Sequence, residues 1–141
     1  GLMRSLVCQS FARNEKAFPR AAMDAILTGY QPGHDSYCFI ALDKDRPVAG
    51  VYVVHDQREA YYLMGGYADG AHHGAGALAI WQAILKAKEM GLKVFDFEGS
   101  ILPNIERYFR GFGGALTPIF SVHKAWFPLE IALKLVRRRI F

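Results

Sequence analysis

Two carboxylates that alternate with aromatic side chains are the clearest chemical signal in the sequence. Asp96 and Glu98 lie in the run Val94–Glu98, in which apolar and acidic residues alternate with a period of two. This period is typical of a strand and places both acids on one face. A buried carboxylate is costly unless it is paired or used in chemistry. We therefore take Asp96 and Glu98 as catalytic candidates, and Glu98, nearer the following loop, as the better proton acceptor.

Cations that could pair with these acids come in the next segment. Arg107 and Arg110 are three apart in a short helix expected near residues 104–110, so they share a face. We expect Asp96 to be substantially buried and matched to one of them. An ion pair that holds helix to sheet and a substrate anchor both remain open for Asp96. Ser100 is expected to be a cap or turn residue, since no base is spaced to activate it as a nucleophile.

A glycine-rich loop, residues 67–76, lies between an expected strand and an expected helix. The backbone amides of Gly74 and Gly76 would point at an anion at the start of that helix, where the helix dipole favours negative charge. A flexible connection would use the same glycines, and the loop is not a P-loop. His72 and His73 have no further ligands at a suitable spacing, so we expect no metal site.

Met64, Gly65 and Gly66 end the strand before this loop. Glycines in a strand indicate either a bulge or close approach of another backbone. A bulge here would free backbone N–H groups that could polarise an acyl carbonyl. Simple termination of the strand is the equally weighted alternative.

The remaining periodicity predicts the elements that hold these groups. In the long central helix, an apolar stripe that faces the core is expected at Leu78, Trp81, Ile84, Leu85 and residues 87–90. The first three strands should form an antiparallel meander, and the fourth should lie parallel to the third. Helices are expected at residues 2–15, from 19 to 29, at 77–90, near 104–110 and at 129–139, and strands at 37–42, 48–54, 60–66, 93–97 and 116–124.

Composition indicates one globular domain over residues 1–141. The chain is 52% apolar and long enough to bury a core. A net charge of +4 suits nucleic acid, anionic lipid, a phosphorylated ligand or a solvated basic surface, and selects none of them. Cys8 and Cys38 lack metal-site spacing, so we expect reduced packing residues in a cytoplasmic protein. There is no signal peptide and no apolar run near the ~18 residues of a membrane span.

Two motifs resemble a known superfamily. The strand, glycine loop, helix and parallel strand are similar to the Gcn5-related N-acetyltransferase (GNAT) fold, whose loop reads Q/R-x-x-G-x-G/A. Gly74 and Gly76 match its glycines, whereas Ala71 stands at the Gln or Arg position. The sequences FDFEGS and IERYFRGFGG resemble, more narrowly, the Fem-type peptidoglycan-bridge aminoacyltransferases. The resemblance covers roughly residues 36–125.

This resemblance implies a mixed α+β fold of the acyl-CoA N-acyltransferase type, with helices on both faces of the sheet. It implies transfer of an acetyl or aminoacyl group from acyl-coenzyme A or aminoacyl-tRNA, which are substrates and not tightly bound cofactors. The acceptor would be an amine, either a small molecule or a cell-wall precursor. Catalysis would rest on Glu98 and Asp96, donor binding on Met64, Gly65, Gly66, His73, Gly74 and Gly76, and substrate binding on Tyr67, Ser100, Arg107 and Arg110.

Other interpretations remain open. Full Fem-like proteins contain two such domains, so this chain would be the C-terminal half of a longer protein or a short relative that forms a homodimer. It could equally be a non-catalytic half-domain that serves as a binding or dimerisation module. Arg107, Arg110 and the basic run at 137–139 could bind tRNA or other RNA. The expected helix at 129–139 could lie on an anionic membrane surface or pack on its own domain.

Overall fold

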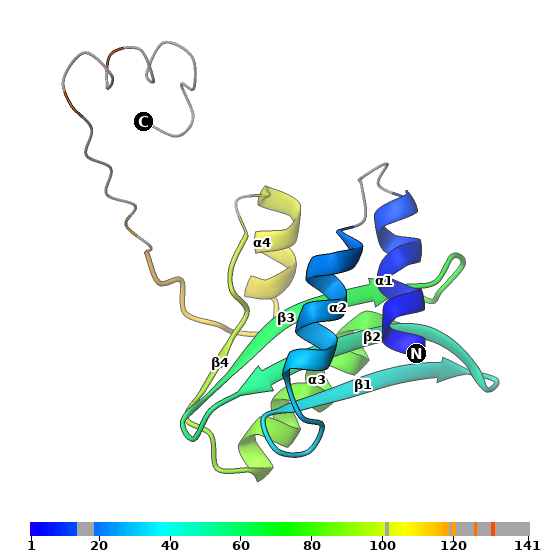
Figure 1. Cartoon of the computed structure of the whole chain (residues 1–141), viewed down its shortest axis with the longest axis horizontal. Helices are drawn as coiled ribbons and strands as arrows, with labels where there is room; N and C mark the ends of the chain where they lie inside the picture. The colour runs from blue at the N-terminus through cyan, green and yellow to red at the C-terminus, as the bar shows by residue number, and fades with distance from the viewer. Residues whose placement is uncertain (14–18, 101, 119, 121–125, 127–130, 132–141) are drawn as a thin grey trace.

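The computed structural model describes residues 1–13, 19–100, 102–118, 120, 126 and 131. Within them a four-stranded sheet is flanked by helices (Figure 1). The helices are α1 (Leu2–Arg13), α2 (Arg20–Gly29), α3 (Ala75–Glu89) and α4 (Pro103–Arg110), and the strands are β1 (Ser36–Asp43), β2 (Arg46–His55), β3 (Glu59–Tyr67) and β4 (Val94–Asp96).

The sheet has the order β1-β2-β3-β4. Its first three strands pair antiparallel and β4 pairs parallel to β3, which confirms the predicted meander and parallel pair. Lys44 and Asp45 form the turn between β1 and β2, with φ of 47° and 67°. Positive φ at both turn residues gives the hairpin the right-handed twist of its strands.

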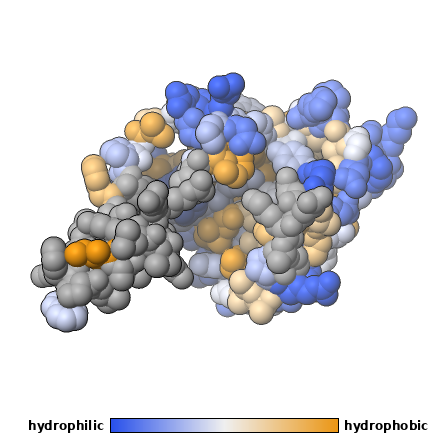
Figure 2. All heavy atoms as spheres, turned by 90° about the horizontal axis from the view of Figure 1, so that it is seen from above, coloured by the Kyte–Doolittle hydropathy of each residue, from blue (hydrophilic) through white to orange (hydrophobic). Residues whose placement is uncertain are grey.

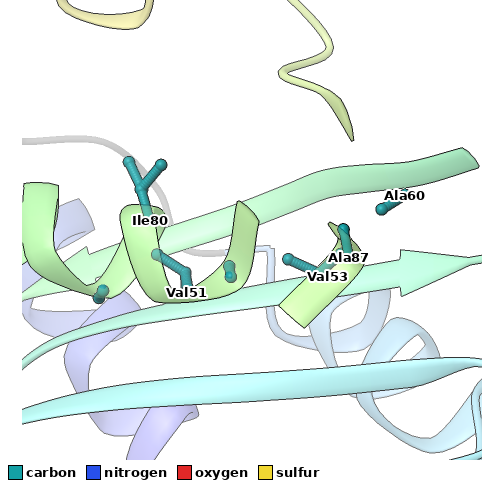
Figure 3. Close-up of a cluster of buried hydrophobic side chains, with 7 residues drawn as sticks. Val51, Val53, Ala60, Ile80 and Ala87 are labelled. Atoms are coloured by element: carbon teal, nitrogen blue, oxygen red, sulfur yellow. The ribbon is translucent and has the colours of Figure 1, made fainter. Parts of the chain in front are cut away.

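The helices cover both faces of the sheet. In Figure 1, α1 and α2 lie in front of the strands and α3 lies behind them. The alternation of β2 divides the core accordingly: Val51 and Val53 pack with α3, whereas Tyr52 and Val54 pack with α1 and α2. Figure 3 shows the α3 side, where Val51 lies near Ile80 of the helix and Val53 lies near Ala87. The predicted α+β fold is therefore confirmed.

The buried face of α3 differs from the predicted one. Leu78, Trp81 and Leu85 are 55%, 48% and 40% exposed, so these three residues of the expected stripe face outward. Ile84 and Ala87 pack against the core as expected. The buried positions are mostly alanine, because small side chains let the helix backbone lie close to the sheet. They are Ala75, Gly76, Ala79, Ile80, Ala83 and Ala87.

A β-bulge interrupts β3 immediately before its glycines. Val53 of β2 lies opposite Tyr62, but Tyr52 lies opposite Met64, so Leu63 is the extra residue. A bulge shifts the alternation of side chains. Tyr62 therefore packs on the α3 side of the sheet, whereas Leu63 and Met64 both pack on the side of α1 and α2. Of the two alternatives for Met64–Gly66, a bulge or the end of the strand, the structure shows a bulge one residue earlier, and the strand continues to Tyr67.

The glycine after the bulge allows close contact between α1 and β3. A Cβ on Gly66 would overlap the backbone of Leu6 and Val7 in α1. One turn further along α1, Ser10 Oγ accepts a hydrogen bond of 2.8 Å from the Tyr67 N–H. The helix is thus held against the strand by a backbone contact and a hydrogen bond.

The last elements are shorter than predicted or fall outside the description. β4 ends at Asp96 because the chain turns at Glu98 and Gly99, where φ is 58° and 64°. Residues 116–118 and 120 of the strand expected at 116–124 have no regular structure, and the rest of that segment lies outside the described residues. The helix expected at 129–139 also lies outside them, apart from Ile131. Among the helices that are described, none has the length and apolarity needed to cross a bilayer.

The contact at Gly66 predicts a sharp difference between two glycines. Gly66→Ala should lower the free energy of unfolding by about 1–3 kcal/mol or more, because the new methyl group meets the α1 backbone. Gly29→Ala, at the end of α2 with open space around it, should leave stability unchanged or raise it by up to ~1 kcal/mol. Urea unfolding of both variants measures this. Equal stability of the two variants would contradict the close packing of α1 on β3.

Candidate functional site

The parallel strands β3 and β4 separate after a short paired stretch. Glu59–Tyr61 pair with Val94–Asp96, and no pairing between the two strands is seen beyond them in the described part of the chain. β3 continues to Tyr67 along this open edge, and the Leu63 bulge lies within it. Backbone N–H and C=O groups of an unpaired edge are free to bind another chain or a ligand.

A hollow of about 410 Å³ lies beside β4 and brings several predicted residues together. Asp96 and Glu98 supply carboxylates, and Phe97 and Phe109 supply aromatic surface. Residues 114–117 also line the hollow. The remaining polar lining residues include Ser100, Glu106 and Arg110. Figure 2, a view from above, shows apolar side chains near the middle of this view and polar side chains at its top and right.

The predicted burial and pairing of Asp96 are wrong. Its side chain is exposed, because β4 is the edge strand of the described sheet, and Oδ1 accepts a 2.7 Å hydrogen bond from the Glu98 N–H. Arg110 instead pairs with Glu106, one helical turn away, at 2.6 Å. Arg107 is exposed and has no ion pair among the described residues. Neither arginine therefore forms an ion pair with Asp96 or Glu98, and both acids have no ion pair among the described residues.

Glu98 and Ser100 lie in the turn that leaves β4. Glu98 is exposed and has a left-handed backbone, with φ of 58°, which costs free energy in a residue other than glycine. Ser100 Oγ accepts a hydrogen bond of 3.1 Å from the Leu102 N–H, as expected of a turn residue. The turn aims both side chains at the same hollow.

The start of α3 offers unpartnered backbone donors. His72 Nδ1 accepts from the Gly74 N–H at 3.0 Å, so that amide is already engaged. The amides of Gly76 and Ala77 have no hydrogen-bond partner among the described residues. His73 is exposed in the loop just before them. Within the same residues, no three His, Cys, Asp or Glu side chains gather in a way that could hold a metal ion.

A cluster of tyrosines lies between this loop and α4, and sequence reasoning missed two of its members. Tyr67 and Tyr108 approach each other with hydroxyl oxygens 3.3 Å apart. The ring of Tyr67 occupies the position that a Cβ of Gly76 would take. Tyr62, on the same side of β3, packs edge-on against Phe109 at a ring separation of 5.4 Å. Tyr62 and Tyr108 were the residues missed.

Aromatic stacking joins α4 to the sheet. Phe109 stacks on Phe97 at 5.0 Å, just beyond the end of β4. Tyr108 contacts Phe112 edge-on at 5.5 Å. The spacing of Tyr108 and Phe109 in the short helix and of Phe112 in the turn after it was the signal that could have identified this cluster.

Burial keeps these phenols protonated. Burial, together with the hydrogen bond to Tyr67, raises the pKa of Tyr108 well above the ordinary value of 10.0. Burial likewise raises the pKa of Tyr62. It raises the pKa of Tyr37, which lies in β1 and donates a hydrogen bond to Ala83 O of α3, to about 12. Since the neutral phenol is the favoured form, these groups can donate but not accept a proton at neutral pH.

The sequence model described as "Acetyltransferase (GNAT) domain" matches residues 4–110. The chain belongs to the GNAT acetyltransferase family. Comparison with curated proteins gives no significant match. The family supports acyl transfer as the general chemistry, and the matched span contains the bulge, the glycine loop and the acidic turn. The resemblance stated above is thereby confirmed at the level of the GNAT superfamily.

Solved GNAT structures share the fold. An aminoglycoside acetyltransferase from an uncultured soil metagenomic sample, in complex with sisomicin, is 15% identical, with a TM-score of 0.61 over 89% of this chain and 85% of that chain. Ribosomal-protein-alanine N-acetyltransferase from Brucella melitensis is 14% identical, with a TM-score of 0.58 over 85% and 87%. A GNAT family protein from Streptococcus pneumoniae is 14% identical, with a TM-score of 0.54 over 83% and 89%.

The raised pKa values predict a two-stage alkaline titration. In denaturant all seven tyrosines should ionise near pH 10, whereas in the folded protein Tyr108, Tyr62 and Tyr37 should ionise later. The stability that Tyr37 contributes is complete below pH 10 and is lost as the pH rises towards about 12. Phenolate absorbance of the native protein and of Tyr108→Phe measures this. Loss of the early phase in the variant would contradict the buried position of Tyr108.

Proposed function

We propose that the protein transfers an acyl group from acyl-coenzyme A to an amine. The observation that carries the proposal is the opening between β3 and β4. It has a bulged strand edge on one side, an acidic hollow on the other and unpartnered amides at the start of α3. Membership of the GNAT family supports the same chemistry.

The start of α3 suits the phosphates of the donor. Gly74 carries no side chain that would keep a phosphate from the loop backbone. The amides of Gly76 and Ala77 are unpartnered among the described residues, and the Tyr67 ring lies over Gly76. The helix dipole adds favourable electrostatics there. His73, exposed beside the loop, is in place to contact the same phosphates. The donor, when bound, supplies the thioester whose carbonyl carbon is attacked.

The open edge of β3 would hold and polarise that carbonyl. We assign this to the backbone of Met64, Gly65 and Gly66, which follow the bulge. Because the N–H groups of successive strand residues point to opposite edges, the N–H groups that serve are those directed away from β2. The Met64 side chain is buried on the side of α1 and α2, so its contribution is through the backbone. Donors fixed in advance stabilise the negative charge that develops on the carbonyl oxygen.

The acidic hollow would receive the amine. Asp96 and Glu98 attract the ammonium form, and Glu98 takes its proton so that the free amine attacks the carbonyl carbon. When the carbon–sulfur bond breaks, the phenol of Tyr108 gives its proton to the leaving sulfur and takes up the second proton that the amine nitrogen loses, so the phenol ends the step protonated. Ser100 and Arg110 line the hollow and Tyr67 lies at the opening. We propose that these three residues and Arg107 contact the acceptor.

One of the similar structures suggests a class of acceptor. That protein is an aminoglycoside acetyltransferase, and it is seen in complex with sisomicin. A small cationic amine would suit the unpaired carboxylates of the hollow in this chain. We therefore propose a small cationic amine as the acceptor.

Donor binding should be sensitive to charge at the loop. Gly74→Glu, in ordinary helical backbone with φ of −81°, should weaken acetyl-coenzyme A by about 10-fold or more, because its carboxylate repels the phosphates. Gln82→Glu adds the same charge on the exposed face of α3 and should leave affinity unchanged. Calorimetric titration compares the two variants with the wild type. Equal affinities would remove the donor site from this loop.

Proton transfer should depend on Glu98. Glu98→Gln keeps the shape of the side chain and should lower kcat by roughly 10²- to 10⁴-fold while acetyl-coenzyme A affinity is unchanged. Glu106→Gln removes a carboxylate from the same hollow that is engaged with Arg110, and kcat should change little. Steady-state rates with a diamine acceptor measure both. A Glu98→Gln enzyme with wild-type kcat would exclude this residue as the base.

A narrower, Fem-type reaction is the alternative donor chemistry. The FDFEGS and IERYFRGFGG motifs support it, and so does Arg107, an exposed cation with no ion pair among the described residues. In that case aminoacyl-tRNA would be the donor, a cell-wall precursor the acceptor, and this cytoplasmic domain the C-terminal half of a tandem protein. Binding of tRNA that does not weaken with salt would argue against it.

A non-catalytic binding or dimerisation module is the second candidate function. The edge of β4, which is unpaired within the described residues, and the outward-facing Leu78, Trp81 and Leu85 favour it, since both are surfaces that pair readily. Light scattering across a concentration series separates the two functions. A monomer that binds acetyl-coenzyme A supports the enzyme, and a dimer without donor binding supports the module.

A further inference from the structure

A tyrosine side chain lies across the route that the proposed donor would follow. Tyr67 ends β3, between the bulge at Leu63 and the loop that leads to α3. Its ring lies on Gly76 at the start of α3, and its hydroxyl meets that of Tyr108 on α4. One side chain therefore connects the two helices on either side of the opening.

This arrangement conflicts with an extended donor in the same place. The phosphates would bind at the amides of Gly76 and Ala77, and the thioester would lie at the open edge of β3. The linker between them must pass Tyr67, which bridges Gly76 and Tyr108 in the donor-free protein. Ring and linker cannot occupy the same volume.

The Tyr67 side chain is held to Tyr108 by a weak contact between the two hydroxyl groups. The separation of 3.3 Å between the hydroxyl oxygens is longer than the 2.7–2.8 Å typical of a strong O–H···O hydrogen bond. The backbone of Tyr67 is held firmly, since its N–H donates to Ser10 Oγ at 2.8 Å. Rotation about the side-chain bonds therefore moves the ring without moving the strand.

We propose that Tyr67 is a gate on the donor slot, closed by its hydrogen bond to Tyr108 and opened when the linker of the donor displaces the ring. The inference rests on the proposed function, because it concerns entry of the same donor. It makes Tyr67 a gating residue as well as a lining residue. Opening also frees the Tyr108 hydroxyl from its partner at the moment the thioester arrives.

The test removes the hydroxyl and keeps the ring. Tyr67→Phe loses the bond to Tyr108, so the open state becomes more populated and coenzyme A should bind about 2- to 10-fold more tightly. The gain should appear in the association rate, because the ring opens more often. Tyr37→Phe is the matched control, since it deletes a tyrosine hydroxyl that bonds Ala83 O on the far part of α3. Its affinity for coenzyme A should equal that of the wild type.

A second ligand distinguishes an effect on the gate from an effect on the phosphate site. Adenosine 3′,5′-bisphosphate carries the phosphate end of the donor without the linker, so Tyr67→Phe should not change its affinity. Tyr67→Ala, which removes the ring, should also bind coenzyme A faster than the wild type. Thermal melting of each variant confirms that it is folded.

The outcomes are distinct. Faster and tighter binding of coenzyme A alone supports the gate, as does binding by Tyr67→Phe when the wild type does not bind. Wild-type affinity and association rate in both Tyr67 variants overturn the gate and leave the donor site standing. An equal gain for adenosine 3′,5′-bisphosphate also overturns the gate, since the hydroxyl then acts on the phosphates. Folded proteins that bind no coenzyme A in any form overturn the donor site and the gate together.

Discussion

The bulge at Leu63 is the constraint on which the rest of the site depends. By adding one residue to β3, it shifts the alternation of side chains, so Tyr62 faces α3 while Leu63 and Met64 both face α1 and α2. A regular strand would place successive residues on opposite faces. Across the bulge, Tyr62 packs with α3 and with Phe109 of α4, whereas the buried Met64 packs with α1 and α2. It lies where β4 no longer pairs with β3.

Much of the fold follows from local chemistry in the sequence. The hairpin turn, the three antiparallel strands, the glycine loop and the parallel strand were all predicted, because period-two patterns and turn residues act over short distances. The orientation of α3 was not. Both faces of that helix are apolar, and large residues such as Trp81 attracted the prediction to the exposed one. Close packing on the sheet selects alanine, a preference that hydrophobicity alone does not reveal.

The functional roles of the predicted site residues remain predictions, whereas their positions can be compared with the structure. Asp96 and Glu98 line one hollow, and Gly74 and Gly76 stand at the start of α3. The buried ion pair was wrong because Glu106, within reach of Arg110 on the same helix, pairs with it locally. Tyr62 and Tyr108 escaped notice because their meeting depends on how α4 docks through Phe97 and Phe109, a tertiary contact.

The backbone contact between Gly66 and α1 has a mechanical consequence. Because Gly66 has no side chain, the backbones of the helix and the strand are in direct contact. The hydrogen bond from the Tyr67 N–H to Ser10 Oγ joins the same two elements one residue further along the strand. A tilt of α1 would therefore be transmitted directly to the strand edge, with little cushioning by side-chain rearrangement. The helix α1 and the strand β3 are therefore expected to move as one rigid unit.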